Sequence, residues 1–110
     1  MKGWKVLLCL PEEPMSSAVS IYAPVSYWWG VWTFPKKGCG PLAVFRTRKA
    51  ARAFVEDRDH SRVVRCEYEP STHRALWTVD KRFVTTLNEL PKDTLLADAV
   101  MPLHRDGGAH

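Results

Sequence analysis

The sequence predicts an α+β domain: a curled, mainly antiparallel sheet of about six strands with one main helix at about residues 48–58. Short apolar or alternating runs between proline-rich and glycine-rich turns are typical of strands. One stretch has the apolar period of a helix. The chain has 110 residues, which suits one domain with one core. We expect residues 1–104 to form this domain and residues 105–110 to be a disordered tail.

The helix is predicted from its cap and its apolar stripe. Thr47 stands where an N-cap residue should stand, directly after the apolar run Leu42–Phe45. The apolar residues that follow have the spacing i, i+1, i+4, i+5 and are Ala50, Ala51, Phe54 and Val55. They form one stripe that can pack against a sheet.

The charges of this helix are reversed relative to its dipole. Cations gather at the predicted N-terminus (Arg46, Arg48 and Lys49), and acids at the C-terminus (Glu56, Asp57 and Asp59). Each such charge costs roughly 0.3–1 kcal/mol when exposed, so we expect Arg48→Glu to stabilise the free protein slightly. Free N–H groups beside three cations also make an anion site. The alternative is that these charges are solvated and paired elsewhere in the chain.

The segment Val25–Phe34 is rich in aromatic residues and is predicted to be a strand. Alternation places one set on one face (Tyr27, Trp29 and Val31) and a second set on the other (Trp28, Trp32 and Phe34). One short helix can cover only one face of a sheet. The rings therefore pack in a curled sheet, stack on a base, or form a dimer face.

The remaining strands follow from shorter patterns. Residues 4–10 predict a central strand, and residues 15–23 predict an edge strand. Residues 63–69 alternate, with Val64, Cys66 and Tyr68 facing inward, and are predicted to form a hairpin with residues 75–79. A further strand is expected at 83–87, whereas periodicity leaves residues 95–103 open between helix and strand.

Composition limits the function classes. The formal net charge is +4, which weakly favours acidic partners. Three widely spaced cysteines without a C-x-x-C pair predict no metal site and no disulfide framework. The longest apolar run is too short to span a bilayer, and no secretory signal is recognisable, so a cytoplasmic protein without membrane contact is expected. We expect no cofactor and assign no catalytic residue.

Three segments together resemble a group of small uncharacterised proteins of phages and prokaryotes. They are C-G-P-L-A-V-F-x-T-x-x-A-A-x-x-F from Cys39, R-C-E-Y-E-P from Arg65, and L-P-x-x-T-x-L-A-D-x-V from Leu90. The resemblance covers roughly residues 27–103. It implies a strand at residues 95–103 and a viral accessory role, including interference with host nucleotide signalling or nuclease defence. It implies no established activity.

The sequence therefore predicts a non-enzymatic protein that binds a nucleotide or nucleic acid. The phosphate would meet the helix start and the basic turn before it, at Lys36, Lys37, Arg46, Thr47, Arg48 and Lys49. The base would stack on Trp28, Trp29 or Trp32. The alternative is a protein-interaction module that docks a host protein through the aromatic face. A homodimer through that face and an enzyme that acts on nucleotides through Glu67, Glu69 or His60 are the other possibilities.

Overall fold

The computed structural model describes residues 1–8, 15–17, 25–56, 61–77 and 84–103. In chain order the strands are β1 (Lys2–Leu8), β2 (Met15–Ser17), β3 (Ser26–Tyr27), β4 (Leu42–Phe45), β5 (Ser61–Pro70), β6 (Ala75–Trp77), β7 (Val84–Thr86) and β8 (Thr94–Pro102). The helix α1 (Arg48–Val55) follows β4, and a 3₁₀ turn, η2 (Leu87–Glu89), follows β7.

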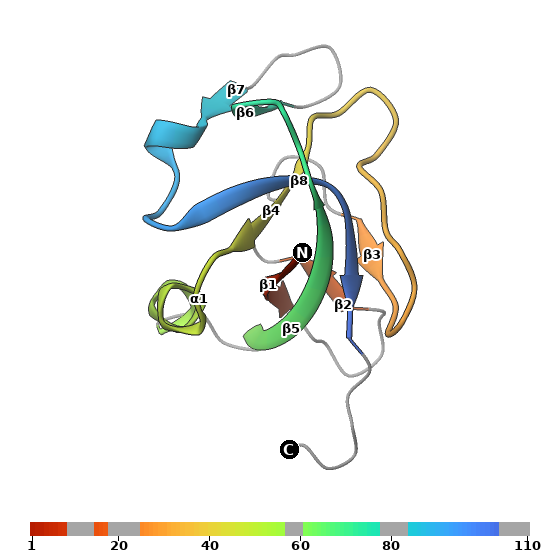
Figure 1. Cartoon of the computed structure of the whole chain (residues 1–110), viewed down its shortest axis with the longest axis vertical. Helices are drawn as coiled ribbons and strands as arrows, with labels where there is room; N and C mark the ends of the chain where they lie inside the picture. Colours follow the sequence, from red (N-terminus) through yellow and green to blue (C-terminus); the bar gives the residue numbers. More distant parts are fainter. Residues whose placement is uncertain (9–14, 18–24, 57–60, 78–83, 104–110) are drawn as a thin grey trace.

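Four strands close into a small barrel (Figure 1). β1 pairs with β4, β4 with β8, β8 with β5, and β5 again with β1, and every one of these pairings is antiparallel. β2 and β3 extend the sheet outward from β1, and β6 and β7 form a separate two-stranded hairpin. The predicted fold class, a curled antiparallel sheet with one main helix, is confirmed.

Two clusters of apolar side chains fill opposite faces of the curved sheet. Neighbouring residues such as Val6 and Leu7 belong to different clusters, because side chains alternate along a strand. The first cluster contains Leu7, Tyr27, Leu42, Val44, Val64, Cys66, Tyr68, Ala97 and Val100. The second contains Val6, Ala43, Phe45, Ala51, Leu76 and Leu96, and α1 packs on it through Ala50, Phe54 and Val55.

The helix and its cap agree with the sequence prediction. Thr47 is the N-cap, and Ala51 is buried in the second cluster. The helix ends at Val55 with Glu56 as its C-cap, three residues before the predicted end at 58, and residues 57 and 58 lie outside the described residues. Val64, Cys66 and Tyr68 are buried as predicted, and residues 94–102 are a strand.

The predicted hairpin between residues 63–69 and 75–79 is wrong. β5 pairs with β1 and β8, which are distant in sequence, whereas β6 pairs with β7. The expected edge strand at 15–23 is also wrong where the structure describes it, because β2 lies between β1 and β3. The predicted tail at 105–110 lies outside the described residues.

The predicted aromatic strand Val25–Phe34 is wrong beyond its first residues. Only Ser26 and Tyr27 belong to a strand, because a turn follows in which Val31 N donates to Trp28 O at 3.2 Å. Gly30 has a φ of 73°, which is the conformation that glycine favours in turns. The chain then runs along the edge of the barrel, joined to β8 by an isolated bridge between Thr33 and Val100.

Candidate functional site

The start of α1 leaves backbone donors without intrahelical partners. Thr47 has extended backbone angles, and its hydroxyl accepts from Ala50 N at 3.1 Å. Ala51 N donates to Thr47 O at 3.2 Å. The N–H groups of Arg48 and Lys49 precede the first residue that can bond within the helix. No acid lies in the first turn of α1, so no residue of the helix itself offsets the positive end of its dipole.

A turn from β8 is fixed beside this helix start. Phe45 at the end of β4 pairs with Thr94 at the start of β8, and Arg46 N donates to Asp93 O at 2.8 Å. The Thr94 hydroxyl donates to Pro91 O at 2.6 Å and closes the turn. Strand pairing therefore places residues 91–93 beside the start of α1, although more than forty positions separate Arg48 from residue 91 in the sequence.

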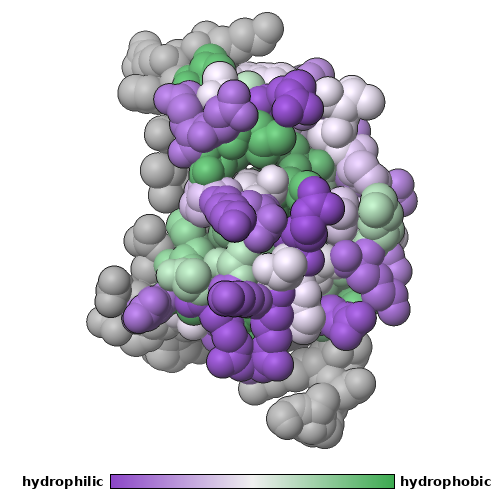
Figure 2. Space-filling model, turned by 60° about the vertical axis from the view of Figure 1, so that its left-hand side comes forward, coloured by the Kyte–Doolittle hydropathy of each residue, from purple (hydrophilic) through white to green (hydrophobic). Residues whose placement is uncertain are grey.

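A groove of about 850 Å³ opens between these two elements, a volume within the usual range for small-molecule sites. It is lined by Thr47, Lys49, Ala50, Ala53, Phe54, Pro91, Lys92 and Asp93. Two ammonium groups and one carboxylate thus lie around an apolar floor. Figure 2 looks at the side of the molecule that carries α1 and the β6–β7 hairpin; its strongest apolar surface lies near the hairpin, and paler apolar surface lies lower, at the level of α1. We call the cavity lined by these eight residues the helix groove.

Only two of the four residues predicted at the helix start line the helix groove, namely Thr47 and Lys49. The Arg46 guanidinium lies 4.0 Å from the Asp93 carboxylate, in an exposed ion pair. The Arg48 guanidinium lies 5.7 Å from the centre of the Trp4 ring, which Arg65 also approaches to 5.5 Å. Lys92, which the sequence analysis did not single out, takes a place in the groove because the β4–β8 pairing brings its turn there.

A second hollow of about 420 Å³ lies between the barrel and the β6–β7 hairpin. Its residues include an apolar group (Leu87, Leu95 and Leu96) and a basic group (Arg46, His73 and Arg74). His73 is held edge-on against Trp77, with ring centres 4.9 Å apart. Arg46 belongs to this hollow and pairs with Asp93 of the helix groove, so the two cavities are neighbours.

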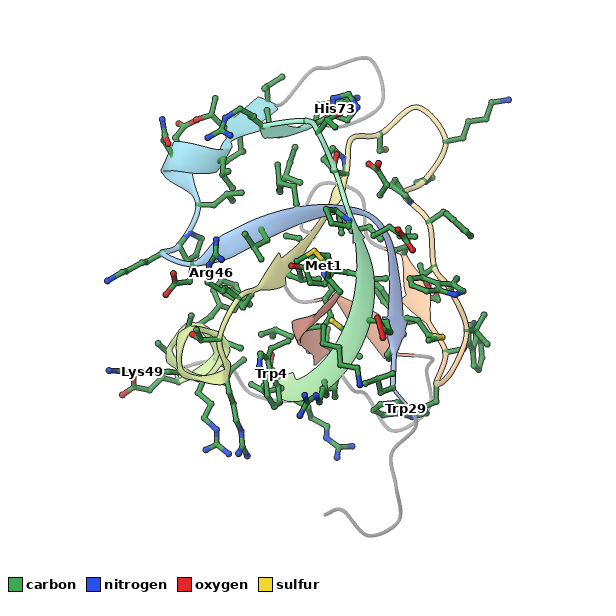
Figure 3. The ribbon with its side chains drawn as sticks, in the orientation of Figure 1. Met1, Trp4, Trp29, Arg46, Lys49 and His73 are labelled. Carbon is green, nitrogen blue, oxygen red and sulfur yellow. The ribbon has the colours of Figure 1, made fainter. Side chains whose placement is uncertain are left out.

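The predicted stacking residues are not brought to the helix start. Figure 3 shows Trp29 and Lys49 on opposite sides of the molecule. The segment between β3 and β4, which contains Lys36 and Lys37, runs along the right of Figure 1, whereas α1 lies at the lower left. The expected composite of a phosphate site beside a tryptophan strand is therefore wrong as a geometry. Of the three tryptophans, Trp28 and Trp32 are exposed, and Trp29 packs on the first apolar cluster.

The structure also contains a buried amine that the sequence analysis missed. Lys5 is fully buried, and its Nζ donates to Ala43 O at 2.5 Å and lies 5.2 Å from the centre of the Tyr27 ring. Burial lowers the pKa of Lys5 to about 7, and the same loss of water raises the pKa of Cys66 to about 11. Burial also raises the pKa of Tyr27, whose hydroxyl has no hydrogen-bond partner among the described residues. The signal for Lys5 was its spacing of two from Leu7, which places both side chains on the same face of β1.

The described residues contain no group of three or more His, Cys, Asp or Glu side chains that could hold a metal ion. Cys39 and Cys66 are free thiols. No helix in the described part of the chain is long and apolar enough to cross a membrane.

No family model, no curated protein and no solved structure matches this chain.

Proposed function

We propose that this protein binds a phosphate-bearing small ligand of the nucleotide class in the helix groove. The observation that carries the proposal is the convergence of Lys49, Lys92 and the capped start of α1 on one cavity of about 850 Å³. Lysines are common phosphate ligands, and a helix start adds N–H donors and a favourable dipole. The predicted ligand class is retained, but its binding residues change.

The groove supports separate places for the two halves of a nucleotide. The phosphates would contact the Lys49 and Lys92 ammonium groups and the N–H groups of the first turn of α1. The base would lie on the apolar floor formed by Phe54, Pro91 and Ala53. Phe54 itself rests on Phe45, with ring centres 5.5 Å apart, so its ring is supported from below. Phe54 thereby takes the part that the sequence analysis gave to tryptophan.

Asp93 would act on specificity. Its carboxylate lines the groove and also pairs with Arg46 at 4.0 Å. A carboxylate repels phosphate and accepts hydrogen bonds from hydroxyl or amino groups. It therefore favours a ligand whose sugar hydroxyls or base amino group meet Asp93 while its phosphates meet the lysines. A bare polyphosphate would contact the lysines and the N–H groups of α1 but would form no hydrogen bond to Asp93.

The test is titration calorimetry with ATP, inorganic pyrophosphate, adenosine and a twelve-residue oligothymidylate, each at low and at moderate salt. We expect ATP to bind more tightly than both pyrophosphate and adenosine, because only ATP uses both ends of the groove. The double variant Lys49→Glu/Lys92→Glu should lose ATP binding by at least tenfold. Binding should weaken as salt rises, since the lysine–phosphate contacts are screened.

The matched control is Lys36→Glu/Lys37→Glu, which has the same change of charge at the turn distant from the groove. It should bind ATP as the wild type does, within about twofold. Equal losses in the two double variants would mean that overall charge, and not the helix groove, attracts the ligand. Tighter binding of the oligothymidylate than of ATP would move the ligand class to single-stranded nucleic acid.

A further inference from the structure

A second surface, on the other side of the barrel, exposes apolar side chains. Within seven residues, Trp28 is 57% exposed, Val31 51%, Trp32 38% and Phe34 64%. Single exposed apolar residues are common, but a contiguous apolar patch marks an interaction site. The segment runs along the right edge of Figure 1, away from α1, and none of its residues lines either cavity described above. We call residues 28–37 the aromatic loop.

The backbone holds the aromatic loop firmly on β8. Gly30 N donates to Pro102 O at 2.8 Å, and Thr33 and Val100 exchange two hydrogen bonds of 2.8 and 2.9 Å. Trp32 and Phe34 flank the bridged Thr33, so they project to the same side of the chain. The exposed rings are thus held on an ordered backbone, so little conformational entropy is lost when they bind a partner.

The charges around the loop select an anionic partner. Lys36 and Lys37 follow the aromatic residues directly and are exposed. No Asp or Glu occurs between Pro14 and Val55 in the sequence, and the carboxylate that β8 exposes near the loop is that of Asp98, two residues before the bridged Val100. The partner must therefore accept apolar side chains at the point of contact and carry negative charge beside it.

The size and the chemistry of the patch decide between partners. A stable protein interface takes roughly 20–30 residues from each side, and the exposed apolar patch comes from one short loop. A nucleic-acid site uses stacking rings, but the exposed Val31 has no face on which a base can stack. A bilayer surface needs only a few inserted apolar side chains, and tryptophan is the residue most typical of its interface.

We propose that the aromatic loop inserts into the surface of a membrane that contains anionic lipids. Trp28, Val31, Trp32 and Phe34 enter the boundary between headgroups and acyl chains, and Lys36 and Lys37 contact the lipid phosphates. The sequence predicted no membrane contact because no segment is long enough to span a bilayer. Binding to the surface does not require such a segment. The helix groove lies on the other side of the barrel and remains open to solvent.

The experiment is sedimentation of the full chain with large vesicles. One set contains phosphatidylcholine alone, and the other contains phosphatidylcholine with roughly 30% phosphatidylserine, which gives the surface a negative potential. We expect binding to the anionic vesicles and much weaker binding to the neutral ones. Trp32→Ala/Phe34→Ala should weaken binding at least tenfold, because two inserted side chains are lost. Lys36→Gln/Lys37→Gln should weaken it roughly thirtyfold on anionic vesicles only, at about fivefold for each lysine.

A matched charge control and an optical readout complete the test. Arg52→Gln/Arg62→Gln removes two exposed cations from α1 and β5, and it should bind within about threefold of the wild type. Anionic vesicles should shift the tryptophan emission to the blue, and Trp28→Phe/Trp32→Phe should abolish the shift while it keeps apolar side chains. An absence of binding, or equal losses in the two charge variants, would overturn the proposal. So would an oligothymidylate that binds the same loop residues more tightly than vesicles do.

Discussion

The Nζ atom of Lys5 lies 2.5 Å from the carbonyl oxygen of Ala43, in a part of the core where the lysine side chain has no exposure to water. Tyr27 and Cys66 are the titratable groups of the first cluster that face this amine. Neither is an acid that ionises at neutral pH to balance an ammonium. The folded protein therefore favours the neutral amine, in contrast to the unfolded chain.

This burial predicts a stability that rises with pH. The pKa of Lys5 is about 7 in the folded state, against 10.5 for an exposed lysine, so the unfolded chain binds more protons between these values. The full penalty is present below pH 7, and it is on the order of 5 kcal/mol at 1.36 kcal/mol per pKa unit. Lys5→Met should raise the urea midpoint at pH 6, and its advantage over the wild type should shrink toward pH 8.5. Ionisation of the Cys66 thiol in the unfolded chain is common to the wild type and the variant, so it cancels from their difference. An advantage independent of pH would show that Lys5 keeps its proton in the folded protein over this range, so that burial does not lower its pKa.

The Thr47 cap predicts a small and specific loss of stability. Thr47→Ala removes the acceptor for Ala50 N and should cost about 1 kcal/mol in the free energy of unfolding. Thr47→Ser keeps a hydroxyl at the same place and should cost only a few tenths of that amount. Urea unfolding of both variants gives the comparison. Equal losses would mean that the threonine methyl group, and not the cap, stabilises the start of α1.

Arg48 shows how the structure changes an expectation drawn from the sequence. Arg48→Glu removes an unfavourable charge at the helix start, worth about 0.3–1 kcal/mol. It also removes the cation–π contact with Trp4, worth about 0.5–1 kcal/mol at an exposed site. The two terms offset each other, so the melting temperature should stay almost unchanged. Lys49→Glu has the same dipole gain, and no contact of Lys49 with an aromatic ring is described, so it should melt above Arg48→Glu.

The parts of the fold that depend on residues close together in the sequence were predictable. The pairing of strands that are distant in the sequence was not. The cap and stripe of α1 follow from nine consecutive residues, Thr47–Val55, and they are found as predicted. The partners of β5 are strands that begin about sixty residues before it and thirty after it, and only the closed barrel brings them together. A local turn at residues 70–74 therefore suggested the wrong hairpin.

The candidate site shows the same division. Thr47 and Lys49 were predictable from the helix start, but Lys92 enters the groove through strand pairing alone. Lys5 was missed because a lysine within a strand is usually exposed, and only three-dimensional packing shows that this one is not. Alternation placed Tyr27, Trp29 and Val31 on one face, and the first two are buried or packed on the first cluster. Val31 is 51% exposed, because the turn at Gly30 breaks the alternation before it.

The aromatic loop predicts unequal effects of three tryptophan substitutions. Trp28→Ala removes a side chain that is 57% exposed and should change the free energy of unfolding by less than about 1 kcal/mol. Trp32 is 38% exposed, so Trp32→Ala should cost about 1–2 kcal/mol. Trp29→Ala removes a ring that packs on the first cluster and should cost about 2–3 kcal/mol. Denaturant midpoints of the three variants and the wild type, measured under the same conditions, test this order. Collapse of the fold in all three variants would place the whole loop in the core.

Gly40 joins the β6–β7 hairpin to the barrel, and the lack of space around it predicts a loss of stability when a side chain is added. Gly40 N donates to Trp77 O at 2.8 Å, and a Cβ on Gly40 would lie 2.6 Å from two atoms of the Trp77 ring and 2.8 Å from Trp77 N. The ring could turn aside, but the backbone nitrogen belongs to β6, so the hairpin itself must move. Gly40→Ala should therefore cost about 1–3 kcal/mol, as overpacked sites do.

The second hollow gives this prediction a local readout. It lies between the barrel and the hairpin, and it contains His73, which packs on Trp77. A displaced hairpin should shift the NMR signals of the His73 ring and leave those of α1 in place. Gly30→Ala is the control, because its φ of 73° makes it strained although nothing lies within 4 Å of the added carbon. If Gly40→Ala destabilises the protein without moving the His73 signals, the contact between Gly40 and Trp77 is not what holds the hairpin on the barrel.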